Sequence, residues 1–121
     1  MNWTEAAKKQ LGMLEGLRLA VENIPCQIKV LEREGAEAES IRALKKSLDR
    51  ARRQVSSIDS ALSALSPEEK LVLYRLYIFP QRGKLELLCQ ELGMEESSIY
   101  RRRDRGMEKF VLALYGENIR S

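Results

Sequence analysis

The sequence predicts an all-α protein: an antiparallel, coiled-coil-like helical hairpin followed by a helix-turn-helix domain. Of its residues, 32% are charged and 6% aromatic, and long alternating apolar and polar runs, typical of half-buried strands, are absent. Apolar residues recur at steps of three and four, the spacing of one helix face. A boundary signal at Ser66-Pro67 divides the chain into residues 1–65 and 66–121.

The first helix is expected to begin near Glu5, with Thr4 or Asn2 as its N-cap. Its apolar face keeps one phase across Pro25, so the segment either kinks there or restarts on nearly the same axis. The unbroken phase favours one kinked rod, which Gly35 ends, and residues 36–40 then form the connection. The apolar positions are Leu14, Leu17, Val21, Ile24, Ile28 and Leu31.

The second helix has a stricter apolar seam, and two such rods joined by a short turn make an antiparallel hairpin. Its basic flank, residues 42–53, is interpreted as a solvated helix face rather than a DNA contact. The residues leave open whether the hairpin closes on itself, forms a homodimer with a second copy or packs on the C-terminal region. The seam positions are Ile41, Leu44, Leu48, Ala51, Val55, Ile58, Leu62 and Leu65.

Residue Ser66 opens the C-terminal region as an N-cap, with Pro67 at the first helical position and Glu69 completing a capping box. This helix stops before Pro80, and residues 79–84 form the loop to the next helix. The apolar residues of the helix are Leu71, Val72, Tyr74, Leu76 and Ile78.

A helix-turn-helix is predicted around Gly93, which supplies the positive φ of a sharp turn between two short helices. The first helix presents Leu85, Leu88 and Leu92 on one face, and Ile99 of the second points back into the core. The second helix continues to a stop at Gly116, and residues 117–121 form a frayed tail. Met107, Phe110 and Leu114 are expected to anchor it on Leu73, Leu76, Leu88 and Leu92.

The exposed face of the second helix, residues 97–108, is the predicted major-groove reader. Arg101 is the candidate for a bidentate contact to guanine, whereas neighbouring arginines position the DNA backbone. Loop cations add phosphate contacts. The candidate DNA-binding residues are Ser97, Ser98, Tyr100, Arg101, Arg102, Arg103, Arg105, Arg82 and Lys84.

Composition excludes several other classes of protein. Two cysteines, Cys26 and Cys89, and no histidine leave no usual zinc spacing and no histidine-based triad. We therefore predict that the protein is not an enzyme and has no cofactor. No apolar run is long enough to span a bilayer and no signal-peptide core is present, so a cytoplasmic protein without a membrane partner is expected.

The C-terminal half resembles region 4 of bacterial sigma factors, in residues 65–73, Leu92-Gly93 and residues 98–102. It is more similar to small phage regulators of late genes of the ArpU and RinA type, in residues 99–104 and 112–116. The resemblance implies a sequence-specific transcriptional regulator, encoded by a phage or prophage, that binds double-stranded DNA in a bacterial host. The hairpin then provides either dimerisation or a contact to RNA polymerase.

Two other functions are compatible with the same residues. A DNA-packaging protein of the small terminase type also joins a helix-turn-helix to a helical oligomerisation hairpin. Alternatively, the C-terminal region is a module that binds RNA polymerase without reading DNA.

Overall fold

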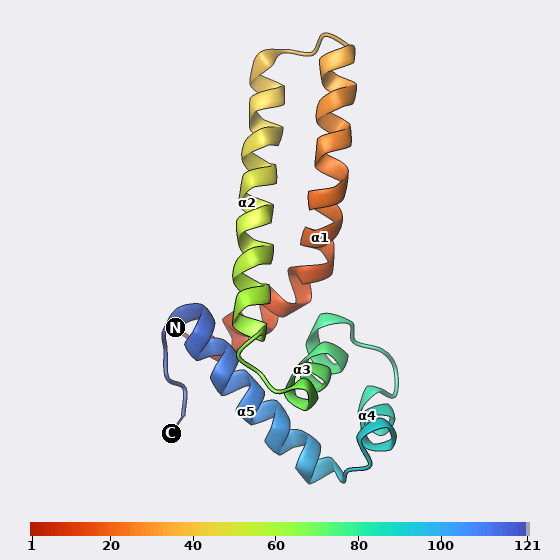
Figure 1. Cartoon of the computed structure of the whole chain (residues 1–121), viewed down its shortest axis with the longest axis vertical. Coiled ribbons are helices and arrows are strands. Elements are labelled where there is room, and N and C mark those ends of the chain that lie inside the picture. The colour runs from red at the N-terminus through yellow and green to blue at the C-terminus, as the bar shows by residue number, and fades with distance from the viewer. Residues whose placement is uncertain (121) are drawn as a thin grey trace.

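The computed structural model describes residues 1–120, which are helical without a β-strand, so the all-α prediction is confirmed. Helices α1 and α2 run antiparallel as a long hairpin, and the shorter helices gather at its base (Figure 1). The elements are α1 (Trp3–Arg33), α2 (Ala38–Leu62), α3 (Pro67–Leu73), the π-helical turn η1 (Tyr74–Ile78), α4 (Lys84–Leu92) and α5 (Glu96–Tyr115).

Helix α1 is one continuous helix that includes Pro25, as the unbroken apolar phase predicts. The side chain of Asn2 caps it by accepting a hydrogen bond from the backbone N–H of Glu5 at 3.1 Å. Helix α2 begins earlier than predicted, at Ala38, because the carbonyl of Glu37 already accepts the N–H groups of Ser40 and Ile41. The connection is therefore residues 34–37 rather than 36–40.

The two predicted seams face each other along the hairpin. Every seam residue is buried or half-buried, and α1 and α2 make the most extensive contact between any two elements of the described chain. This agrees with two amphipathic rods that bury their apolar stripes together. The seam residues with the least exposure are Leu14, Ile28, Leu48, Ala51, Ile58 and Leu65.

The capping box at the start of α3 is confirmed. The backbone N–H of Ser66 donates to Glu69 Oε1 at 2.8 Å, and the N–H of Glu69 donates to Ser66 Oγ at 3.2 Å. The π-helical turn η1 follows directly, and the N–H of Phe79 closes it on the carbonyl of Tyr74 at 2.8 Å. The apolar spacing does not predict this wider turn.

Two apolar clusters hold the base of the molecule together. The larger joins the lower ends of α1 and α2 to α3, η1 and the C-terminal half of α5. The smaller lies beneath α4 and the N-terminal half of α5. The larger cluster contains Ala7, Leu11, Leu14, Ile58, Ala61, Leu65, Leu73, Ile78, Met107, Phe110 and Val111; the smaller contains Val72, Leu76, Leu88 and Ile99.

This division corrects the predicted anchoring of α5. Met107 and Phe110 do pack in one cluster with Leu73, and Leu114 lies against it. The remaining members outside α5 come from the hairpin, the segment after α2 and η1 rather than from α4. The tail also departs from the prediction, since Ile119 is half-buried against the same cluster. Residue Ser121 lies outside the described residues.

No helix within residues 1–120 combines the length and apolarity needed to cross a membrane.

Candidate nucleic-acid interface

Helices α4 and α5 meet at a tight turn centred on Gly93, as predicted. Gly93 has φ 61°, the left-handed conformation that glycine adopts without steric cost. The N–H of Met94 then donates to the carbonyl of Cys89 at 3.1 Å, which ends α4. Glu95 has extended backbone angles, and its carbonyl accepts the N–H groups of Ser98 and Ile99, so α5 starts without a side-chain cap.

The base of this turn is apolar and well packed. Leu88 of α4 and Ile99 of α5 are fully buried against Val72 of α3. The ion pair between Arg75 and Glu91, 3.1 Å long, also ties η1 to α4. The outer face of α5 is therefore presented on a fixed support.

That outer face carries two arginines without an acidic partner in residues 1–120. Arg101 and Arg105 are both exposed, one helical turn apart, and form no ion pair in this part of the chain. Arg101 Nη2 donates to Ser98 Oγ at 3.2 Å, which directs the guanidinium along the helix. With Arg102, these two side chains line a shallow hollow. A planar guanidinium in such a position can donate two parallel hydrogen bonds to one acceptor pair.

The other two arginines of the cluster are held by the protein itself. Arg102 Nε donates to Glu68 Oε2 of α3 at 2.6 Å. Arg103 Nη2 lies 2.9 Å from Asp104 Oδ1, and its guanidinium carbon is 4.7 Å from the centroid of the Tyr100 ring. Both arginines are half-buried, whereas Tyr100 is 39% exposed. Half of the cluster is thus already paired.

The remaining candidates lie on this face, in the loop between η1 and α4, and at Lys84, which begins α4 and was predicted to lie in the loop. Ser97 is exposed and Ser98 half-buried at the start of α5. Arg82 is exposed in the loop and forms no ion pair with the described residues. Lys84, in contrast, folds back, because Lys84 Nζ donates to the carbonyl of Leu76 in η1 at 3.4 Å.

Helix α5 is fixed on α3 by a contact that the sequence does not reveal. Lys109 Nζ of α5 lies 2.8 Å from Glu69 Oε1, the carboxylate that also completes the capping box. Burial of Glu69 acts to raise its pKa, but the hydrogen bonds from Lys109 and Ser66 outweigh burial, so the pKa lies below its usual value of 4.5. Glu68 and Glu69 thus orient α5 from 34 and 40 residues away.

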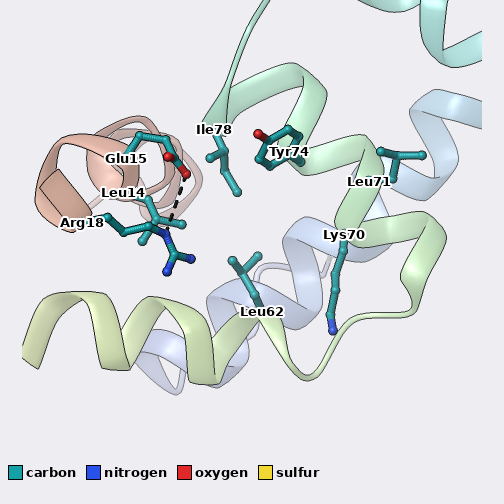
Figure 2. A pocket seen from close by; sticks show the side chains of 8 residues that line it. All are labelled: Leu14, Glu15, Arg18, Leu62, Lys70, Leu71, Tyr74 and Ile78. Atoms are coloured by element: carbon teal, nitrogen blue, oxygen red, sulfur yellow. Dashed lines mark ion pairs between the residues drawn. The ribbon is translucent and has the colours of Figure 1, made fainter. Parts of the chain in front are cut away.

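An apolar groove of about 380 Å³ lies apart from this face, between the hairpin and the α3–η1 segment. Figure 2 shows Leu14, Leu62 and Ile78 pointing toward the groove, with Arg18 Nε 3.7 Å from Glu15 Oε1 on its rim. Arg18 also donates to Asp59 at 2.6 Å. The groove therefore offers apolar contact area with charged groups at the edge.

Comparisons with protein-family models, curated proteins and solved structures find no match to this chain. The resemblance to phage late-gene regulators and to sigma region 4 therefore stays a prediction that depends on the residues quoted for it.

Proposed function

We propose that this chain is a sequence-specific DNA-binding regulator of transcription, encoded by a phage or prophage, that acts on promoter DNA in the bacterial cytoplasm. Its α4–α5 pair acts as the helix-turn-helix, and the N-terminal half of α5 enters the major groove. The observation that carries the proposal is the pair Arg101 and Arg105, exposed and without an acidic partner in the described chain, on the second helix of the turn.

The two halves of α5 differ in burial, which supports placing its N-terminal half in the major groove. Met107, Phe110 and Val111 are buried beneath the hairpin, so this face of the C-terminal half belongs to the core. The N-terminal half projects from the opposite end of the base (Figure 1). In helix-turn-helix proteins the N-terminal residues of the recognition helix contact the base edges.

The pairing pattern assigns a role to each cation. Arg101 reads a guanine through its O6 and N7 acceptors, and Arg105 contacts a base or phosphate one turn further along. Arg102 and Arg103 are neutralised by Glu68 and Asp104, so they contribute shape and position more than net attraction. Ser97 and the Tyr100 hydroxyl donate to phosphates at the groove edge.

The experiment is a selection of bound duplexes from a random-sequence DNA library, followed by affinity measurements on the selected and a scrambled duplex. Arg101→Ala is expected to lose about 1–3 kcal/mol of discrimination, or about 5- to 150-fold in the affinity ratio. Arg33→Ala is the matched control, because Arg33 is exposed near the hairpin tip. A selection without a common sequence, or an unchanged ratio in Arg101→Ala, contradicts the proposal.

A second function is favoured by the groove of Figure 2. Its apolar lining suits a protein segment, and the exposed Tyr74 and Phe79 rings stack near it, 6.3 Å apart. On this reading the module binds RNA polymerase without reading DNA. Retained polymerase binding by Arg101→Ala/Arg105→Ala, with no DNA affinity in either protein, supports it over the first proposal.

A further inference from the structure

The outer face of α2 carries a second group of cations, away from the N-terminal half of α5. Between residues 42 and 53 there are six basic residues and one acidic residue, Asp49. All six are exposed, and all lie outside the apolar seam of α2. We call this group the α2 basic face; it consists of Arg42, Lys45, Lys46, Arg50, Arg52 and Arg53.

None of these six side chains forms an ion pair with any part of the described chain. On α1, the other helix of the hairpin, Lys8 pairs with Glu5 and Arg18 pairs with Asp59. An ordinary solvated helix intersperses opposite charges, which stabilise each other at spacings of three and four. The α2 basic face repeats like charges at these spacings in Arg42, Lys46 and Arg50, and Asp49 is the one acidic residue interspersed among its six cations.

The chemistry of the face indicates what covers it. Interfaces between folded proteins have an apolar or aromatic centre, but every large apolar side chain that is strongly exposed in residues 1–120 lies outside α2. The neighbouring outward residues of α2 are serines, Ser56, Ser57 and Ser60. Arginine, lysine and serine without an apolar centre are the groups that contact phosphate oxygens along a nucleic-acid backbone.

The face is long enough to follow such a backbone. From Arg42 to Arg53 the helix rises about 16 Å at 1.5 Å per residue. Helix α2 is straight along this length and stands clear of α3, α4 and the N-terminal half of α5 (Figure 1). A rod with this many like charges attracts a polyanion through counterion release, without reading its sequence.

We propose that the α2 basic face is a second DNA-binding surface, which holds the phosphate backbone of duplex DNA independently of sequence. The choice of DNA as the polyanion rests on the proposed function, whereas the surface itself does not depend on α5 reading bases. The protein then contacts DNA at two places, with α5 for selectivity and α2 for sequence-independent affinity.

The test measures binding of a scrambled DNA duplex across a salt series for wild type and for Arg42→Gln/Lys46→Gln/Arg50→Gln. Removing one phosphate-binding cation makes the slope of log affinity against log salt shallower by about 0.9, so the triple variant should be shallower by about 2–3. The control is Lys9→Gln/Lys29→Gln/Arg33→Gln, which removes three exposed cations from α1. It has the same change in net charge, and its slope should change by less than about 1. Circular dichroism verifies that both variants remain helical.

A second variant changes the face in the other direction. Asp49→Gln removes its one acidic group and should steepen the slope and tighten binding to scrambled DNA. Equal slopes in the α2 and α1 triple variants, or no change in Asp49→Gln, overturn the proposal. The affinity ratio between selected and scrambled duplexes should stay constant in the α2 variants. Loss of that ratio in Arg101→Ala tests the function of α5 separately, so failure of one proposal does not resemble failure of the other.

Discussion

Glu69 joins two elements that are far apart in the sequence. Its carboxylate accepts the backbone N–H of Ser66 at 2.8 Å and the ammonium of Lys109 at 2.8 Å, while the residue is only 5% exposed. The two hydrogen bonds favour the charged form strongly enough to overcome burial, so the pKa of Glu69 is lowered. Because the folded pKa lies below the unfolded one, this carboxylate stabilises the fold above the unfolded pKa.

We predict that Glu69→Gln lowers the free energy of unfolding by about 1–2 kcal/mol at neutral pH. The amide oxygen can still accept the backbone N–H of Ser66, but the ion pair with Lys109 is lost. The difference from wild type should shrink as the pH falls through the folded pKa, because the wild-type carboxylate is then protonated too. Urea unfolding at neutral and acidic pH measures both values. Glu117→Gln, an exposed change, should have no such pH dependence. A difference that persists in acid contradicts this account.

The sequence predicts only one of the two contacts of Glu69. Ser66 and Glu69 are three residues apart, a local spacing with a known geometry, so the capping box could be predicted. Lys109, the partner of Glu69, and Arg102, the partner of Glu68, both come from α5. No local sequence pattern indicates which carboxylate each of them contacts. The predicted arginine cluster therefore did not reveal that Arg102 and Arg103 are paired while Arg101 and Arg105 are not.

Gly16 of α1 and Gly106 of α5 differ in how closely neighbouring atoms approach them. A Cβ built on Gly16 of α1 meets nothing within 4 Å, whereas one built on Gly106 of α5 lies 3.3 Å from Glu69 Cβ and 3.4 Å from Leu65 Cδ2. Gly106 is buried, and its missing side chain is what lets α5 lie against α3. Glu69 Cβ cannot yield easily, because the capping box and Lys109 hold that side chain.

We predict different effects of adding one methyl group to these two helices. Gly16→Ala should raise the free energy of unfolding by about 0.5–1 kcal/mol, the usual gain from replacing glycine inside a helix. In Gly106→Ala the added methyl group crowds Glu69 and Leu65, and the cost of this overpacking cancels the gain. The free energies of unfolding of the two variants should therefore differ by at least about 1 kcal/mol. Chemical unfolding of both variants measures the difference. Equal stabilisation by both would show that α5 is not closely seated on α3.

Element boundaries follow the same division between local and distant causes. The seams of α1 and α2 and the turn at Gly93 could be predicted, because period and backbone conformation are local properties. The π-helical turn at residues 74–78 could not, because the apolar residues between Leu71 and Ile78 are compatible with more than one helical spacing. The start of α2 at Ala38 was also missed, since no Ser, Thr, Asp or Asn precedes it to mark a cap.

The molecule as a whole depends on a core that the hairpin and the base build together. Leu11 of α1 and Ile58 of α2 share one buried cluster with Phe110 of α5. Trp3 at the start of α1 packs against Tyr115 at the end of α5, with 4.9 Å between ring centroids. The sequence indicates two regions that meet near Ser66. It cannot show which helix faces pack together, because an apolar face carries no information about which other apolar face it contacts. As a result, Leu73 is correctly predicted as a neighbour of Met107 and Phe110, but Leu88 belongs to the other cluster.

A shared core predicts that the two regions unfold together. Trp3 is the single tryptophan of the chain, so its fluorescence reports on the junction while circular dichroism reports on all helices. We expect both signals to change in one coincident transition, the mark of two-state unfolding. Leu11→Ala, which opens a cavity in the shared cluster, should lower the free energy of unfolding by about 2–5 kcal/mol in both signals. Leu19→Ala, at a side chain that is 58% exposed, should cost less than about 0.5 kcal/mol.

If fluorescence shifts to lower denaturant in Leu11→Ala while most of the helical signal keeps its midpoint, the hairpin and the base are stable separately. In that case α5 is supported by α3 and α4 alone, and the hairpin is free to move relative to the face that we propose binds DNA.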